Sequence, residues 1–218
     1  MVGSAVVQRV ARPRADAVRN RERIVATARE MFVEYGADVP LDDIARRAGV
    51  GNATLYRHFP DRRELIHTVT LSVLTRTAEQ AETALAEEAS AFQALRRFVH
   101  AAVDERMGAM CPLFSRWIQP GDPEFTEARE RLSRAVQDLI EAAQRSGELR
   151  PDIGLGDLMV AVSQLARPLP GTACQGVDRF VHRHLELLLD GLSTPRPSEL
   201  PGFAVTLDDL RGHGEECR

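Results

Sequence analysis

Residues 49–65, GVGNATLYRHFPDRREL, bring together side chains that can bind a polyanion or contact hydrogen-bonding edges. A hydroxyl, a phenol, a guanidinium and an imidazole precede Phe59, and two further arginines follow within the next charged run. Guanidinium groups form charge-assisted, often bidentate hydrogen bonds with phosphate, and phenol O–H and imidazole N–H groups donate to the same kind of oxygen. The stretch therefore has the chemistry of a phosphate-binding surface, provided that the fold exposes these groups together.

The elements that must position this stretch are predicted from apolar spacing and turn residues. A stripe of period 3.6 that stops at Gly36 predicts a first helix, and a second, short helix is expected over residues 41–48. Asn52 is the expected N-cap of a third short helix. Asp61 and Glu64 have the spacing of a capping box that opens a fourth helix through about residue 85. The residues expected to face inward are Ile24, Ala28, Met31, Phe32, Tyr35, Leu41, Ile44, Ala45, Ala48, Leu55 and Phe59.

The second and third helices are predicted to form a helix-turn-helix. Ala45 is small where the two helices must cross closely, Gly49 suits the positive φ of the turn, and Val50 fills the corner. The start and outer face of the third helix then project away from the core, and a DNA major groove is wide enough to admit one helix. The residues expected to face bases and nearby phosphates are Gly51, Asn52, Ala53, Thr54, Tyr56 and Arg57.

Arg62 and Arg63 lie in the first turn of the fourth helix, where the helix dipole disfavours cations by about 0.3–1 kcal/mol. A bound phosphate would reverse that sign, because helix N-termini and guanidinium groups both attract it. Tyr56 and His58 would donate to the same phosphate backbone. The alternative is that Tyr56 and His58 pack on the core and that both arginines are simply solvated.

The segment RIVATAREMFVEYGADVPLDDIARRAGVGNATLYRHFPDRRELI resembles the DNA-binding domain of the TetR family of one-component transcriptional regulators. The part AGVGNATLYRHFPDRREL carries most of this resemblance. It implies a homodimeric repressor with an N-terminal DNA reader and a C-terminal ligand-binding and dimerisation domain, and it implies phosphate contacts from His58 and Arg62. The family often opens the second helix with a hydroxyl residue, whereas this chain has Pro40 and Leu41 there.

Charge is distributed unevenly along the 218 residues, which contain 28 arginines, no lysine and a net charge of −4. Residues 1–67 hold 12 arginines and 9 acidic residues, a net charge of +3, whereas residues 68–218 hold 16 arginines and 23 acidic residues, a net charge of −7. A polyanion is therefore expected at the N-terminal end. No apolar run approaches the ~20 residues of a membrane span and no signal peptide is evident, so we expect no membrane partner and a cytoplasmic protein.

Every strong pattern beyond residue 66 is helical, so the predicted fold is all-α: a three-helix, helix-turn-helix DNA-binding domain followed by a helical ligand-binding and dimerisation bundle. The expected divisions are a flexible, arginine-containing arm over 1–16, the DNA-binding domain over 17–66, the bundle over 67–193 and a loosely ordered tail over 194–218.

The predictions of a small-molecule effector and of a second subunit rest on two groups of apolar residues in the bundle. A Met/aromatic cluster either packs in the core or lines a cavity for an unknown small-molecule effector. The last two helices have wide apolar stripes, half of which is expected to meet a second copy of the chain and so to place two readers on a pseudo-palindromic DNA operator. The cluster is Met107, Met110, Phe114, Trp117 and Phe125; the stripe residues are Leu155, Leu158, Val162, Leu165, Val181, Leu185, Leu188 and Leu192.

No catalytic residue, metal site or cofactor is predicted. Gly154-Leu155-Gly156 lacks the preceding strand of a nucleotide-binding loop, and the three cysteines are too widely spaced for a metal knuckle. His100 and Asp104, four apart on a helix, are expected to form an exposed ion pair or else a polar lining, and His182 and His184 do not share a helix face. Alternatives to a ligand-released repressor are an activator or architectural DNA-binding protein controlled by a protein partner or by no effector, and a helical-bundle enzyme.

Overall fold

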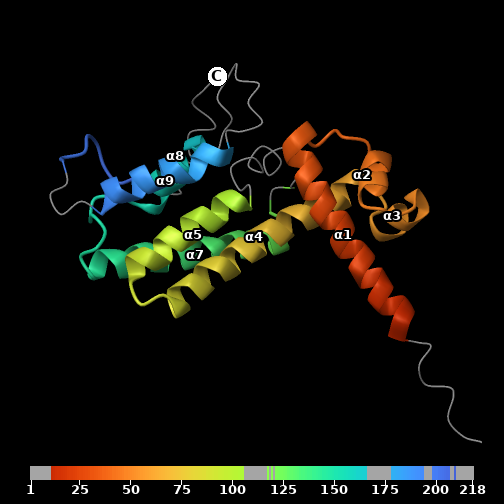
Figure 1. The fold of residues 1–218 in the computed structure, drawn as a ribbon, viewed down its shortest axis with the longest axis horizontal. Helices are drawn as coiled ribbons and strands as arrows, with labels where there is room; N and C mark the ends of the chain where they lie inside the picture. Colours follow the sequence, from red (N-terminus) through yellow and green to blue (C-terminus); the bar gives the residue numbers. More distant parts are fainter. Residues whose placement is uncertain are drawn as a thin grey trace, which may run out of the picture. The chain divides into compact units, whose positions relative to one another are not determined.

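The computed structural model describes residues 11–105, 117, 119, 121–165, 178–193, 198–206 and 209, and every regular element within those residues is an α-helix (Figure 1). The all-α prediction is confirmed. The chain forms two compact units, residues 1–70 with 113–118 and residues 71–112 with 119–218. Among the described residues, no helix is both long enough and apolar enough to cross a lipid bilayer.

Helix α1 (Ala11–Tyr35) begins earlier than expected, so residues 11–16 of the predicted flexible arm are helical. Pro13 lies in the first turn, where a missing backbone N–H costs nothing. Residues 1–10 lie outside the described residues. The predicted stripe is buried except at its end: Tyr35 is 63% exposed, because it is the last helical residue and the chain reverses at Gly36 with φ 84°.

The helix-turn-helix forms as predicted from α2 (Leu41–Arg47) and α3 (Asn52–His58), which pack on each other and on α1. Gly49 has φ 66°, a left-handed conformation that side chains with a Cβ disfavour, and Val50 N–H donates to the Ala45 carbonyl at 3.0 Å. The predicted cap is wrong: Gly51 is the N-cap in extended conformation, and Asn52 is the first helical residue. The Asn52 side chain is thereby released from capping and is exposed.

Helix α4 (Arg62–Glu87) begins with the predicted cap, since the Glu64 N–H donates to Asp61 Oδ1 at 2.9 Å. Its first nine residues belong to the first unit, and the remainder belongs to the second. The two units therefore share one continuous helix.

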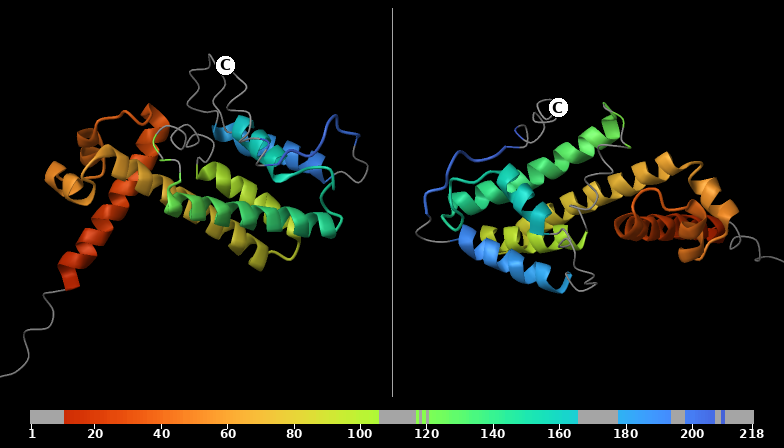
Figure 2. Two further views of the ribbon diagram at one scale, coloured as in Figure 1. Left: turned by 180° about the vertical axis from the view of Figure 1, so that it is seen from behind. Right: turned by 90° about the horizontal axis from the view of Figure 1, so that it is seen from above.

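The second unit is a bundle of the rest of α4 with α5 (Ala91–Asp104), α7 (Pro123–Arg145), α8 (Leu155–Leu165) and α9 (Asp178–Leu192), shown from two sides in Figure 2. Helix α5 packs against both α7 and α9, and α8 packs against α7 and α9. Ser90 and Asp122 cap α5 and α7 by accepting from the backbone N–H groups of Gln93 and Phe125. The fully buried large side chains are Leu95, Leu139, Ile140, Leu185 and Leu189.

A segment of the predicted loose tail, residues 198–206, is fastened to the start of α8. The Gly156 N–H donates to the Val205 carbonyl at 2.8 Å, and Asp157 Oδ2 accepts from the N–H groups of Gly154 (2.8 Å) and Val205 (3.0 Å). A Cβ on Gly154 or Gly156 would lie 2.6 or 2.4 Å from the Val205 oxygen. The two glycines therefore admit a backbone segment, and the prediction of a loosely ordered tail is wrong for these residues.

Arg150 fastens the same segment from the other side. Its side chain is 7% exposed, it pairs with Asp152 through two hydrogen bonds of 2.6 and 2.8 Å, and its Nη2 donates to the Ser198 carbonyl at 2.7 Å. Hydrogen bonds to a charged group are stronger than those between neutral groups. The segment is thus part of the second unit's structure.

Candidate nucleic-acid interface

Helix α3 has one buried side and one exposed side. Leu55 and the following Phe59 are completely buried, whereas Tyr56 is 46% exposed and Arg57 is exposed. The other predicted contact residues at the start of the helix are also at the surface: Gly51, Asn52 and Ala53 are exposed, and Thr54 is half-buried. The fold therefore brings the predicted base- and phosphate-facing residues together on one accessible surface, which we call the α3 face; their DNA contacts remain predictions.

His58 differs from its neighbours on the α3 face because it is half-buried. Its Nε2 is buried and has no hydrogen-bond partner among the described residues. Desolvation lowers the pKa of His58, and the nearby charges of Arg57 and Arg21 lower that pKa further. The free protein therefore favours the neutral form of His58 more than an exposed imidazole would.

Arg62 has protein partners that the sequence did not reveal. Its Nη1 donates to the backbone carbonyls of Ala37 and Val39, the latter at 2.6 Å. These carbonyls belong to the connection between α1 and α2, so Arg62 ties the start of α4 to the base of the helix-turn-helix. The sequence predicted a phosphate contact for Arg62, whereas its Nη1 binds these two carbonyls. Arg63, one residue further on, is exposed and stays the predicted phosphate ligand.

Arg21 is a residue that sequence reasoning missed. Its guanidinium carbon lies 5.2 Å from the centroid of the Phe59 ring, and its Nη2 donates to Thr68 Oγ1 at 3.3 Å. Arg21 therefore links α1 to the end of α3 and to α4. No local pattern points to this role, because the partners lie 38 or more residues away in the sequence.

The arginines of α2 are engaged in ion pairs at the surface. Arg46 pairs with Asp43 at 2.8 Å, and Arg47 pairs with Glu34 and, at 3.6 Å, with Glu30 of α1. Exposed pairs of this kind contribute little to stability. Arg46 partly neutralises the charge of Asp43 at this surface.

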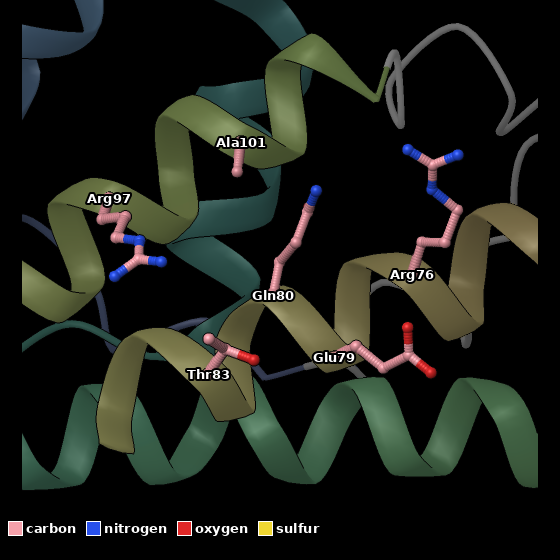
Figure 3. Close-up of a pocket in the computed structure, with 6 residues that line it drawn as sticks. All are labelled: Arg76, Glu79, Gln80, Thr83, Arg97 and Ala101. Atoms are coloured by element: carbon pink, nitrogen blue, oxygen red, sulfur yellow. The ribbon is translucent and has the colours of Figure 1, made fainter. Parts of the chain in front are cut away.

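A cavity of about 340 Å³ opens in the second unit between α4 and α5 (Figure 3). Its two arginines are already paired, since Arg76 binds Glu105 at 2.7 Å and Arg97 binds Glu87 and Glu88. Gln80 projects from α4 toward α5, and its Oε1 is buried with no hydrogen-bond partner in the described part of the chain. The lining residues are Arg76, Glu79, Gln80, Thr83, Arg97 and Ala101.

The predicted effector cluster is not the group that lines this cavity. Met107, Met110 and Phe114 lie outside the described residues. Trp117 belongs to the first unit and Phe125 to the second. The signal that was missed is a polar one: Arg76, Glu79, Gln80 and Thr83 are spaced by three, one and three residues on one face of α4.

Four residues of the predicted dimerisation set lie in the core of their own chain and are at most 8% exposed there: Leu155, Leu158, Val181 and Leu185. The dimer contacts of the whole set stay predictions. Val162, Leu165, Leu188 and Leu192 are half-buried. The exposed apolar side chains lie on the neighbouring faces of the same helices. We call this group the α8/α9 apolar patch: Met159 (37% exposed), Val160 (44%), Phe180 (57%) and Leu187 (62%).

Comparison with known proteins covers both units. Residues 24–69 match the family described as bacterial regulatory proteins, tetR family, and residues 90–194 match the SbtR-like transcriptional regulator C-terminal domain. An HTH-type transcriptional regulator of Staphylococcus aureus is 43% identical over 53 residues, which are 24% of this chain and 29% of that protein. The chain thus matches less than a third of the length of this curated relative.

Solved structures are similar over nearly their whole length. A TetR transcriptional regulator from Streptomyces coelicolor is 31% identical with a TM-score of 0.62, and the match covers 82% of this chain and 99% of the other. A TetR regulatory protein from Mycobacterium vanbaalenii is 29% identical, also at 0.62, over 84% and 99%. The TetR-like regulator LfrR of Mycobacterium smegmatis, solved with proflavine, shares the fold at 19% identity, a TM-score of 0.61, and coverage of 84% and 99%.

Proposed function

Because this chain belongs to the TetR family of DNA-binding transcriptional regulators, we propose that it is a cytoplasmic homodimeric repressor whose operator complex is released by a small molecule. The observation that carries the DNA-binding part is the one-sided exposure of α3. Leu55 and Phe59 anchor the helix, and its first turn and outer face stay open to a major groove about 12 Å wide.

In the proposed complex, some residues of the α3 face contact bases and others contact phosphates. Asn52 is exposed and has no capping bond, so its amide is available for a bidentate contact with a base edge. Tyr56, Arg57 and Arg63 bind phosphates on either side of the groove and set the register of the helix. Arg62 and Arg21 contribute by holding α3 in place and not by touching DNA.

The α8/α9 apolar patch supports the homodimer. Exposed apolar patches on helices favour burial against a partner, and two-fold pairing lets one patch bind its own copy. A dimer of this kind carries two copies of α3 and therefore binds two half-sites about one helical turn apart. The operator is accordingly expected to be pseudo-palindromic.

The cavity between α4 and α5 is the proposed effector site. Charged, amide and hydroxyl side chains line it beside apolar surface, which favours an amphipathic ligand with hydrogen-bonding groups over a purely apolar one. The same helix, α4, carries Arg62 at its start and Gln80 at the cavity. A ligand that shifts α4 would thus change the contact of Arg62 with the α1–α2 connection, which holds the helix-turn-helix. Such a ligand releases the operator if it binds the DNA-free protein more tightly than the DNA-bound protein.

The first prediction concerns base discrimination by Asn52. Replacement by alanine is expected to reduce discrimination at one operator position by about 5- to 150-fold, since a good bidentate base contact contributes about 1–3 kcal/mol. Thermal stability should stay unchanged because the side chain caps nothing. The measurement is fluorescence anisotropy with a set of single-base operator variants. Arg63→Ala is the matched control and should weaken all variants alike; an equal loss for Asn52→Ala would assign Asn52 to the phosphate backbone.

The second prediction concerns the effector. A small molecule that binds at 100 times its Kd is expected to stabilise the protein by about 2.7 kcal/mol, visible in a thermal-shift screen, and to release the operator. Gln80→Leu should reduce that shift because it replaces the amide that projects from α4 toward α5 with an apolar group. Gln93→Leu, at an exposed position of α5, should retain it. A screen in which no compound stabilises the protein would favour control by a protein partner or by no effector. A Gln80→Leu variant that responds like Gln93→Leu would place the ligand outside this cavity.

A further inference from the structure

Two histidines connect α5 to α9 in an arrangement that neither the family match nor the proposed function explains. His100 Nδ1 and His182 Nδ1 are 2.7 Å apart. On the outer side of each ring, His100 Nε2 lies 2.7 Å from Glu186 Oε1, and His182 Nε2 lies 3.1 Å from Asp104 Oδ1. The expected ion pair between His100 and Asp104 is therefore wrong, because each residue binds a group on the opposite helix.

The two imidazole rings meet edge to edge. Their planes are inclined by 16° and their centroids are 5.0 Å apart. Stacked rings would keep their atoms at a van der Waals separation of ~3.5 Å or more. A nitrogen–nitrogen distance of 2.7 Å lies well inside that limit. The nearly parallel planes are consequently almost coplanar, and the two Nδ1 atoms point at each other along the line of a hydrogen bond.

Hydrogen-bond bookkeeping fixes the number of protons in this arrangement. A carboxylate only accepts, so each Nε2 must carry a proton to bind Glu186 or Asp104. Two neutral rings would then have bare Nδ1 atoms facing each other, with their lone pairs opposed. Two doubly protonated rings would oppose two N–H groups and two positive charges. The Nδ1–Nδ1 hydrogen bond and both carboxylate contacts form together only when the pair holds three ring protons, which is a net charge of +1.

A metal ion does not fit between the rings. An ion on the line joining the two Nδ1 atoms would lie at half of 2.7 Å from each nitrogen, well inside the ~2.0–2.1 Å of a zinc–nitrogen bond. In the part of the chain that the structure describes, no cluster of three or more His, Cys, Asp and Glu side chains could hold a metal. A proton is the cation that matches the distance.

We propose that His100 and His182 share one proton and form a pH-dependent clamp between α5 and α9. The charged groups that face the pair are Asp104 and Arg96 from α5 and Glu186 and Asp190 from α9. Arg96 holds Glu186 at 3.1 Å and Asp190 at 2.9 Å, so Glu186 is kept in position for His100. The proton-sharing pair thus sits between two carboxylates, one at each end.

The clamp opens on both sides of an intermediate pH. As pH falls, a second proton on the pair places like charges on adjoining nitrogens and breaks the contact. As pH rises, loss of the shared proton removes the positive charge between Glu186 and Asp104, and the neutral pair keeps its Nδ1–Nδ1 hydrogen bond only if one ring gives up the Nε2–H that binds its carboxylate. Helix α9 also carries Phe180 and Leu187, so the clamp would control presentation of the proposed dimer patch, a consequence that rests on the proposed function.

The direct test is a pH titration of the ring nitrogens of the whole protein by ¹⁵N NMR. His100 and His182 are expected to take up their first proton together, each Nδ1 shifting about halfway toward its protonated position over one common transition. His184 is the internal control, because its Nδ1 contacts only its own helix at the Phe180 carbonyl (2.7 Å) and should titrate alone. Independent, complete transitions for His100 and His182 would contradict the proposal that the two rings share one proton.

Thermal denaturation of variants tests the clamp without NMR. His182→Gln is expected to lower the melting temperature by about 2–4 °C at intermediate pH. The difference from the wild type should shrink toward pH 5 and toward pH 9. His184→Gln should show no such maximum. A difference that does not vary with pH would overturn the proposal, as would stabilisation by added Zn²⁺ that is lost in His182→Gln. Dimer dissociation is measured separately, so a failed clamp and a failed dimer proposal remain distinguishable.

Discussion

Replacing both Phe180 and Leu187 of α9 with glutamate is expected to convert the protein to a monomer and to weaken operator binding by about 100-fold or more. These side chains are 57% and 62% exposed in the single subunit. Burying one such side chain against a partner contributes about 1.5–3 kcal/mol, and two-fold symmetry uses each residue twice. A monomer also loses the avidity of two linked half-site contacts, which multiplies affinity by about 10²–10⁴. Light scattering coupled to size exclusion measures the mass, and anisotropy measures the affinity.

Phe203→Glu is the matched control for the dimer variant. Phe203 is 79% exposed but lies on the fastened segment of 198–206 and not on α8 or α9. It should leave both the mass and the affinity unchanged. A double variant that remains dimeric with normal thermal stability would place the interface elsewhere.

Arg62→Ala is expected to destabilise the first unit by about 2–3 kcal/mol while leaving the salt dependence of DNA binding unchanged. The variant leaves the carbonyls of Ala37 and Val39 without their charged donor, and each such hydrogen bond contributes about 1–1.5 kcal/mol when the donor is only half-buried. DNA affinity should fall because α2 and α3 are held less firmly. The measurements are urea denaturation and a salt series of binding constants.

Arg63→Ala separates positioning from phosphate binding. Arg63 is exposed, so its loss should change stability by less than about 0.5 kcal/mol. It should instead reduce the slope of log K against log salt by about one, the signature of one lost phosphate contact. If Arg62→Ala reduced that slope and left stability unchanged, Arg62 would bind phosphate and would not serve to hold the α1–α2 connection.

The local features were predictable from the sequence because they depend on neighbours a few residues apart. The stripe of α1, the turn at Gly49 and the cap at Asp61 each follow from side-chain volume, φ preference or a hydroxyl or carboxylate at a fixed spacing. Even the error at Asn52 is small: the cap lies one residue earlier, at Gly51. The type and order of these helices therefore followed from periodicity together with turn and cap residues.

The features that were missed depend on residues far apart in the sequence. Val205 meets Gly156 across 49 residues, and His182 meets His100 across 82. Periodicity also does not distinguish which side of a wide apolar stripe faces the subunit's own core. This is why Leu185, a core residue, was assigned to the interface while Leu187, two residues away and on another face, was not.

The proposal that α3 lies in a DNA major groove is tested most directly by fluorescence anisotropy. The purified protein is titrated into labelled duplex DNA from the region flanking its gene, at a series of salt concentrations. We expect tight binding at low salt and a linear fall of log K with log salt, because arginines displace counterions from phosphates. Absence of binding to any duplex at low ionic strength would contradict it.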